Sequence, residues 1–312
     1  MHRTSTCRDM EQNKKTIMNF ETIQEFNDAL GVETLHPLVS VIDMSQCKPM
    51  HPMRHTMSFY AIFLKDEKNC EIIYGNTKYD YNKGDVVCLA PGQIIGIEDD
   101  GHIFQPQGYA LFFDPEFIRG TSLGKNIRRY GFFSYQVNEA LHLSEKERTT
   151  FIECLNLIKD ELNHDIDRMT RQLVCSYIEI LVNYCQRFYE RQFVTREPIN
   201  SALLAKFETL LNDYFKQNNM NRGLPTVNYC ASELCLSPNY FGDLIKKETG
   251  QTATDYIHKH IIDATKELLA DTSRSITDVS YQIGFQYPQH MSRMFKKETG
   301  VTPAQYRKQI TA

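Results

Sequence analysis

Apolar residues in the last third of the chain recur at the spacing of a helix face, in a pattern that occurs twice. Val227 and Cys230 in the first copy correspond to Ile276 and Val279 in the second, 49 positions later. In each copy these residues fall on one face of a short helix. A turn follows, and then a second amphipathic helix that ends at a glycine. The pattern predicts helix, turn and helix in residues 226–250 and again in residues 275–300.

The run Lys-Lys-Glu-Thr-Gly at residues 246–250 reappears unchanged at residues 296–300, an offset of 50. Because the upstream offset is 49, the turn of the second copy holds one additional residue. Between the copies, residues 253–270 have the period of one continuous helix, about 27 Å long at about 1.5 Å per residue. Such a rod would hold the two second helices about one turn of DNA apart. Its predicted inward stripe is Ile257, Ile261, Ala264 and Leu268.

The second helix of each copy is predicted to expose hydrogen-bonding residues near its start and basic residues further along. A helix that reads base edges in a major groove needs this division, because other side chains must hold the phosphates. The alternative is a helical bundle whose lysines only favour the helix C-terminal dipole. The predicted base-edge residues are Asn239, Tyr240, Asp243, Lys246, Gln289, His290 and Arg293; the phosphate contacts are Ser237, Lys247, Lys296 and Lys297, and Ser292 also faces outward.

Residues 200–312 resemble the DNA-binding domain of AraC-type transcription regulators, which carry two helix-turn-helix units joined by a long helix. The resemblance rests on the run 236–241 (Leu-Ser-Pro-Asn-Tyr-Phe), on Ile-Gly-Phe at 283–285, and on Phe-Lys-Lys at 295–297. It departs at Ser280, Met291 and His260, where the family usually has Ala, Phe and Arg. The resemblance implies double-stranded DNA as a partner, and RNA polymerase if the protein is an activator, the direction it favours.

Residues 38–113 change to short extended runs separated by turn residues, which is typical of a sandwich or barrel. Residues 81–92 resemble the second half-motif of a small cupin barrel, the usual N-terminal domain of AraC-type regulators. Inward positions Arg54, Phe59, Tyr60 and Tyr79 are candidate contacts for a small-molecule effector. His51 and His55 are too few and too poorly spaced to predict a metal site, and neither a metal nor a cofactor is expected.

Residues 143–194 return to helical spacing and predict a hairpin of two amphipathic helices. Ser144 and Glu147 form a capping box at its start. The hairpin either packs on the strand domain of its own chain or forms a homodimer interface, as the resemblance implies. The candidate dimerisation residues are Leu173, Tyr177, Leu181, Tyr184 and Phe188.

The fold class expected is therefore α+β multidomain: a cupin-like small β-barrel with a helical hairpin, followed by an all-α double helix-turn-helix domain. The expected boundaries are a disordered extension at 1–19, the cupin-like domain at 20–142, the hairpin at 143–194, a linker at 195–199 and the DNA-binding domain at 200–312.

Composition changes this picture little. The net charge of the 312 residues is −4, although residues 200–312 carry 13 Lys and Arg against 11 Asp and Glu. Phosphate contacts must therefore be local. Nine cysteines without Cys-x-x-Cys spacing predict buried thiols in a reducing cytoplasm. No apolar run has the length of a membrane span, and the first residues are polar and lack the apolar core of a secretion signal, so a cytoplasmic protein is expected.

The leading interpretation is a sequence-specific DNA-binding regulator controlled by a small molecule. One alternative is a DNA-bound interaction protein without an effector, whose barrel serves only dimerisation. A large closed apolar pocket favours the sensor, and a filled barrel favours this alternative. A cupin-type enzyme is disfavoured, because the chain has no HExxH, Walker, G-x-S-x-G or dinucleotide-binding motif.

Overall fold

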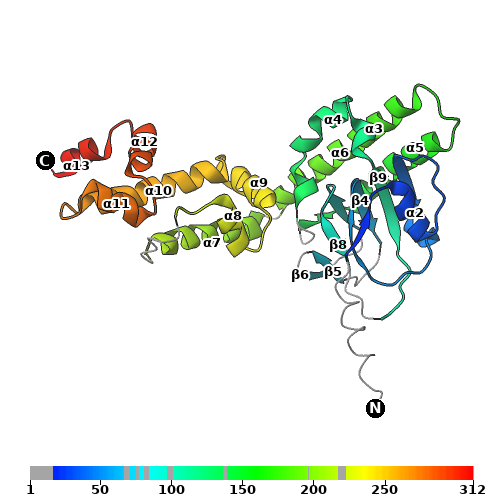
Figure 1. The fold of residues 1–312 in the computed structure, drawn as a ribbon, viewed down its shortest axis with the longest axis horizontal. Coiled ribbons are helices and arrows are strands. Elements are labelled where there is room, and N and C mark those ends of the chain that lie inside the picture. The colour runs from blue at the N-terminus through cyan, green and yellow to red at the C-terminus, as the bar shows by residue number, and fades with distance from the viewer. Residues whose placement is uncertain are drawn as a thin grey trace, which may run out of the picture. The chain divides into compact units, whose positions relative to one another are not determined.

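The computed structural model describes residues 17–66, 71–74, 77–80, 84–96, 101–135, 139–195, 197–216 and 223–311. The chain divides into two compact units, the first ending at Val194 and the second beginning at Thr195. Each is described by itself below (Figure 1). Residues 1–16 of the expected N-terminal extension lie outside the described part.

The first unit contains two five-stranded sheets. The strand order is β1-β3-β8-β5-β6 in one sheet and β10-β7-β4-β9-β2 in the other. The strands are β1 (Met18–Phe20), β2 (Val39–Asp43), β3 (Arg54–Met57), β4 (Tyr60–Lys65), β5 (Glu71–Tyr74), β6 (Thr77–Asp80), β7 (Asp85–Leu89), β8 (Ile94–Gly96), β9 (Gly108–Phe113) and β10 (Leu141–His142).

The second sheet is buried on both faces, which gives its strands continuous apolar runs. All five residues of β7 are buried, and β4 pairs antiparallel with both β7 and β9. Alternate residues of β4 therefore point to opposite sides. Ala61 and Phe63 face the core shared with the first sheet, together with Phe112 of β9. Tyr60 faces the other side, where its ring stacks on Phe113 at 5.0 Å.

The small closed barrel expected from the sequence is not found, since the described strands form two separate sheets with a common apolar core. Neighbouring strands along the chain do not always share a sheet, since β3 belongs to one sheet and β4 to the other. Met18 and Asn19, placed at the end of a disordered extension, instead form β1 together with Phe20, and β1 pairs in parallel with β3. Pairings between distant strands leave no local signal, which explains these errors.

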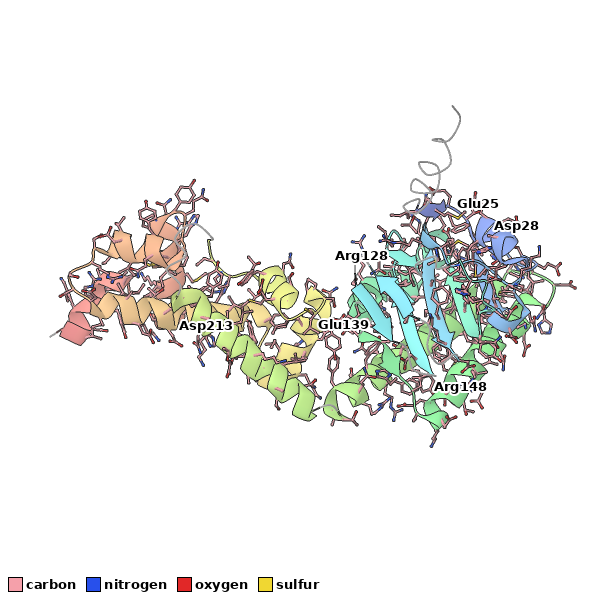
Figure 2. The ribbon with its side chains drawn as sticks, turned by 90° about the horizontal axis from the view of Figure 1, so that it is seen from below. Glu25, Asp28, Arg128, Glu139, Arg148 and Asp213 are labelled. Atoms are coloured by element: carbon pink, nitrogen blue, oxygen red, sulfur yellow. The ribbon has the colours of Figure 1, made fainter. Side chains whose placement is uncertain are left out.

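Helix α2 (Ile23–Leu30) closes one side of this core. A capping box of Thr22 and Glu25 begins the helix, and Gly31 ends it with φ 73°; Figure 2 labels Glu25 and Asp28 on its exposed side. Ile23, Phe26 and Leu30 are buried at the i, i+3, i+7 spacing of an amphipathic helix.

Helices α5 (Glu145–Leu162) and α6 (Thr170–Thr195) follow, and the predicted capping box of Ser144 and Glu147 is present at the start of α5. Arg191 of α6 donates to Glu147 at 2.7 Å and to the His142 carbonyl at 2.7 Å. The end of α6 therefore lies beside the start of α5, the arrangement of an antiparallel pair. Arg148, labelled in Figure 2, binds Asp66 at 2.6 Å and joins α5 to the end of β4.

The second unit is entirely helical in its described residues. Its helices are α7 (Glu197–Lys216), α8 (Val227–Glu233), α9 (Pro238–Thr249), α10 (Ala253–Ala270), α11 (Ile276–Ile283), α12 (Pro288–Thr299) and α13 (Pro303–Thr311). The linker expected at residues 195–199 is largely helical, because α6 extends to Thr195 and α7 starts at Glu197. Pro198 is compatible with this, since the first turn of a helix does not use its N–H groups.

The long helix between the copies has the predicted limits, but its inward face is rotated from the prediction. Ile257 and Ile261 are buried as expected. Thr265 and Leu269 are buried in place of Ala264 and Leu268, which are only half-buried. Arg307 of α13 fixes the end of this helix, because its guanidinium donates to the Leu269 carbonyl at 3.0 Å and to the Arg274 carbonyl at 2.8 Å.

The two helix-turn-helix turns share one backbone hydrogen bond and differ in one residue type. The Leu236 N–H donates to the Ala231 carbonyl at 2.9 Å, and the Phe285 N–H donates to the Ser280 carbonyl at 3.0 Å, 49 positions later. The left-handed position of the turn is Gly284 in the second copy, with φ 107°, and Cys235 in the first, with φ 57°. A side chain disfavours this conformation.

Cys235→Gly is expected to raise the stability of the second unit by about 0.5–1 kcal/mol. Glycine removes the clash between Cβ and the backbone but also gives the unfolded chain more freedom, so the net gain is smaller than the strain released. Differential scanning calorimetry would measure the shift. Cys235→Ala is the matched control, since it keeps the Cβ; equal effects of the two substitutions would contradict the strain argument.

Candidate nucleic-acid interface

The second helix of each copy begins at a proline and ends at a glycine. In α9 the Ser237 hydroxyl accepts the Tyr240 N–H at 3.2 Å, and Pro238 occupies the first turn. In α12 the corresponding N-cap residue is Tyr287, whose side chain makes no capping hydrogen bond, and Pro288 follows. Gly250 and Gly300 end the helices with φ 72° and 79°. The sequence signals therefore place both helix boundaries correctly.

Each of these helices buries one face in the second unit and leaves the other in solvent. Phe241, Leu244 and Ile245 are buried in α9, and Met291 and Phe295 are buried in α12. Rotation about the helix axis is fixed by these anchors, so the exposed residues project from one side of each helix. The candidate residues with exposed side chains are Asn239, Asp243, Lys246, Lys247, Gln289, His290, Arg293, Lys296 and Lys297, and Ser292 is half-buried.

Two of the candidate contacts do not reach the surface. Tyr240 is 5% exposed and forms part of the apolar face of α9, so it cannot lie against a base edge in this conformation. Ser237 is 2% exposed, and its hydroxyl caps the helix instead of facing a phosphate. A tyrosine beside Phe241 extends an already wide apolar stripe, and its mixed polarity makes its orientation difficult to read from sequence.

The exposed residues correspond between the copies at the offset of 50. Asn239 matches Gln289, and both side-chain amides can pair with adenine in a major groove. Asp243 matches Arg293, so this position carries opposite charges in the two helices. The lysine pairs of the last turns match as well, and they also favour the helix dipole. The two faces therefore share a framework but would read different bases.

The linker helix contributes a stacked pair of rings near its start. His260 lies 4.9 Å from Tyr256, ring to ring, and its Nδ1 lies 3.1 Å from the Tyr256 carbonyl oxygen. The Tyr256 hydroxyl donates to Glu208 of α7 at 2.6 Å. Burial and the neighbouring Glu208 carboxylate raise the pKa of Tyr256 to about 12. These contacts join α10 to α7 and orient the linker helix within the unit.

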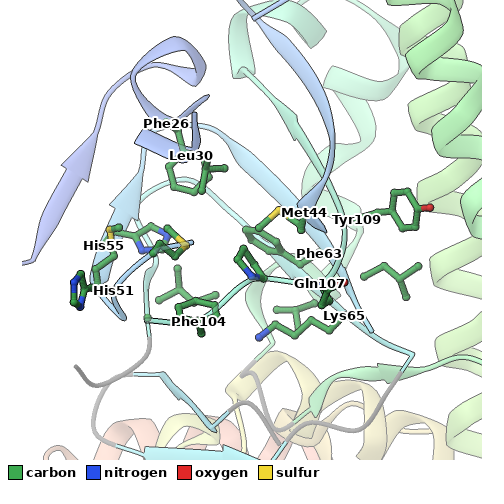
Figure 3. A pocket seen from close by; sticks show the side chains of 17 residues that line it. Phe26, Leu30, Met44, His51, His55, Phe63, Lys65, Phe104, Gln107 and Tyr109 are labelled. Carbon is green, nitrogen blue, oxygen red and sulfur yellow. The ribbon is translucent and has the colours of Figure 1, made fainter. Parts of the chain in front are cut away.

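The first unit contains an apolar pocket between its two sheets, beside α2, with a cavity volume of about 110 Å³ (Figure 3). Phe26, Met44, Phe63 and Phe104 are among the residues that line it. Arg54, Phe59 and Tyr60, three of the four candidate effector contacts, do not line it. Phe59 is fully buried in the core and Tyr60 faces the other side of its sheet, while Arg54 is half-buried in β3. Tyr79 lies in β6, whose side chains are outside the described part.

The candidate dimerisation residues are split by burial. Leu181 and Phe188 are buried inside the first unit, whereas Leu173, Tyr177 and Tyr184 are half-buried. The five residues predicted from the sequence therefore lie on two different faces of α6, one buried in the first unit and one partly exposed. Ile180, which it missed, is 45% exposed.

Within the described ranges, no group of three or more His, Cys, Asp or Glu side chains is arranged to hold a metal ion. Six of the seven described cysteines are buried, and Cys235 is exposed. Among the helices that the structure describes, none combines the length and apolar character needed to cross a membrane.

Residues 230–309 match the model of a family described as a helix-turn-helix domain. The transcriptional regulatory protein YesN of Bacillus subtilis strain 168, itself uncharacterized, is 30% identical over 141 residues, which cover 44% of this chain and 37% of YesN. The HTH-type transcriptional activator RhaR of Salmonella schwarzengrund is 30% identical over 102 residues, which cover 32% of this chain and 36% of RhaR. The matched region thus spans about a third of each relative.

Among solved structures, a transcriptional regulator from Chromobacterium violaceum, described as containing an AraC-type DNA-binding domain, is 21% identical with a TM-score of 0.30; the match covers 35% of this chain and 96% of that one. The repeated helices and the sequence relatives agree on the nature of the second unit. Residues 230–309 of this chain belong to a helix-turn-helix domain.

Proposed function

We propose that this chain is a sequence-specific DNA-binding transcriptional regulator, which places α9 and α12 in two adjacent major-groove segments of double-stranded DNA. The observation that carries the proposal is the pair of matched exposed faces, each anchored by buried residues on its opposite side. Each face has an amide near its start, Asn239 or Gln289, and two lysines in its last turn. That order suits base contacts first and phosphate contacts further along.

Lys297→Ala is expected to weaken binding of all duplexes alike. It should also reduce the slope of log affinity against log salt concentration by about one, the contribution of one phosphate contact. Lys297 is exposed, and its ammonium forms only a long ion pair, 3.9 Å, with Glu298 Oε1, an exposed contact of the kind that contributes little. Fluorescence anisotropy between about 50 and 200 mM salt would measure the slope. Lys308→Ala, in the last turn of α13, is the matched control. An unchanged slope for Lys297→Ala would argue against the proposed orientation of α12.

The pocket supports control of the protein by a small molecule. A domain used only for dimerisation has no need of an apolar cavity, and such cavities are the usual sites of small ligands. We therefore favour a sensor over an effector-independent interaction protein or an enzyme of the cupin type. The cupin resemblance stays a prediction, in part because residues 81–83 of its half-motif lie outside the described part.

Homodimerisation through α6 is the second part of the proposal. Leu173, Tyr177, Ile180 and Tyr184 are at least partly exposed and follow one another at intervals of four, three and four residues. This spacing is typical of a helix seam that packs against a second helix. A second copy of this chain, presenting the same stripe, is the proposed occupant.

Ile180→Glu is expected to shift the protein from dimer to monomer, because it places a charge at the centre of the apolar stripe. Sedimentation velocity across a concentration series would measure the shift. Gln172→Glu introduces the same carboxylate at an exposed position outside the stripe and should leave the dimer intact. A wild-type protein that is monomeric at all concentrations would contradict this part of the proposal.

The direction of regulation is proposed as activation, through contact with RNA polymerase. The similarity to the activator RhaR supports this direction, although it concerns only the DNA-binding region. Transcription in vitro from a promoter containing the selected site would test it: increased transcript supports activation, and decreased transcript overturns it.

A further inference from the structure

One half-buried polar side chain lines the pocket of the first unit with ring nitrogens that lack the hydrogen bonds burial normally requires. His55 belongs to β3, where it shares the inward face with the buried core residue Met57. Both of its ring nitrogens are shielded from solvent, and neither makes a well-oriented hydrogen bond among the described residues, although the Met53 backbone lies close enough to act on the ring. Buried polar groups are rarely left in this state.

The surroundings of His55 are apolar and aromatic. Its ring lies 5.8 Å from that of Phe20 and 5.4 Å from that of Phe26. Burial lowers the pKa of His55 to about 4, with the Met53 backbone acting weakly in the opposite direction. The imidazole is therefore neutral near pH 7. A neutral imidazole offers one N–H donor and one acceptor nitrogen, so it matches a group that can both accept and donate.

The remainder of the pocket restricts the ligand to an apolar body. Met44, Met50 and Met53 line it with flexible thioether side chains, which adapt to irregular shapes. Its four other polar or charged long side chains are His51 and Gln107, which are exposed, and Lys65 and Tyr109, which are half-buried on β4 and β9 in the opposite sheet. Figure 3 shows Lys65 and His55 on different walls of the pocket. His55 is thus the polar group on the wall formed by β3.

We propose that this pocket binds a small uncharged molecule with an apolar body and one hydroxyl group, and that the His55 imidazole recognises the hydroxyl. A carboxylate in contact with a neutral buried imidazole would lose its hydration without gaining a positive partner, which disfavours anions. A hydrocarbon of the same shape would fill the cavity but leave both ring nitrogens unpaired. The binding site itself does not depend on the proposed regulator function. Only the role of the ligand as an effector rests on that function.

Three probes with the same 4-ethylphenyl body test the inference on the free full-length protein: 4-ethylphenol and 4-ethyltoluene, which match in shape, and 4-ethylbenzoate, whose carboxylate is larger and charged. Calorimetric titration or ligand-observed NMR would give their dissociation constants. We expect 4-ethylphenol to bind about fivefold more tightly than 4-ethyltoluene, from one net hydrogen bond, and 4-ethylbenzoate to bind most weakly. Equal affinities for the first two probes, or no binding of any probe, would overturn the proposal. Tightest binding of 4-ethylbenzoate would overturn it in favour of a cationic recognition group.

Substitutions of His55 test whether this residue causes the preference for 4-ethylphenol. His55→Phe should abolish the preference for 4-ethylphenol while leaving the affinity for 4-ethyltoluene within about twofold, and His55→Gln, which keeps a donor and an acceptor, should retain part of it. His36→Phe is the matched control, because His36 is a half-buried histidine outside the pocket. Circular dichroism would verify folding, and the glutamine variant decides the matter if the phenylalanine variant does not fold. A preference that survives in His55→Phe would refute the assignment.

DNA binding is measured in parallel with the same preparations. A protein that binds DNA but shows no preference for 4-ethylphenol would overturn this inference and leave the proposed regulator function standing. A protein that prefers 4-ethylphenol but does not bind DNA would overturn the proposed function and leave the ligand site standing.

Discussion

Arg293→Ala is expected to weaken binding to the preferred DNA site by about 1–3 kcal/mol and to remove the base preference at one position. Arg293 is exposed on the second turn of α12, and its helix is anchored by the buried residues Met291 and Phe295 on either side. Within the described residues it makes no ion pair, so its guanidinium is available. A helix-borne arginine can bind O6 and N7 of guanine with two hydrogen bonds.

The measurement is fluorescence anisotropy with the preferred duplex and with duplexes substituted singly at each base pair. For the Arg293→Ala protein, one base-pair substitution should no longer weaken binding, while the other base-pair substitutions should weaken it as they do for the wild type. The equivalent residue of α9, in the first helix-turn-helix copy, is Asp243, so the two halves of the site are expected to differ in sequence. If Arg293→Ala weakened every duplex equally, Arg293 would be a phosphate contact and the proposed reading would be wrong.

Gly284→Ala is expected to destabilise the second unit by about 2–4 kcal/mol, the largest stability effect predicted for this chain. Gly284 has φ 107°, and an added Cβ would lie 2.4 Å from the carbonyl oxygen and 2.7 Å from the carbonyl carbon of Gly223. Strained backbone and overpacking each cost about 1–3 kcal/mol. Because the obstacle is backbone, it cannot move aside as a flexible side chain can.

Differential scanning calorimetry of the full chain would measure the loss. Gly250→Ala is the matched control, since this residue also has positive φ, 72°, but an added Cβ would meet nothing within 4 Å. Gly250→Ala should show only the cost of placing a Cβ at a left-handed backbone position, about 1–2 kcal/mol. If both substitutions cost the same, the close approach of Gly223 would have no energetic role.

The second unit could be predicted in most of its detail because its information is local. Capping residues, prolines at helix starts and glycines at helix ends all lie within a few positions of the boundaries that they set. The repeat added a second, independent reading of each element. The error at Tyr240 arose where local pattern is ambiguous, since an aromatic side chain with a hydroxyl can extend a buried stripe or face solvent.

The first unit was predicted less well because its defining features are long-range. The predicted strands correspond to observed ones, but the pairing of β1 with β3 joins residues far apart in the chain. The face toward which a strand residue points depends on that pairing, and Tyr60 was consequently assigned to the wrong side. The pocket collects residues from α2, both sheets and two loops, so no single stretch of sequence announces it. In the sequence, His55 drew attention only together with His51, as a pair too poorly spaced to predict a metal site.

The most direct test of the central claim is a selection from random duplex DNA at moderate salt, with the full chain and with residues 195–312 in parallel. The account predicts enrichment of two different short elements whose centres lie about one helical turn, or about 10 base pairs, apart. A dimer of the full chain should enrich duplexes that contain this pair of elements twice. Binding that enriches no element with either protein, and that only declines with salt, would contradict the claim that α9 and α12 read DNA sequence.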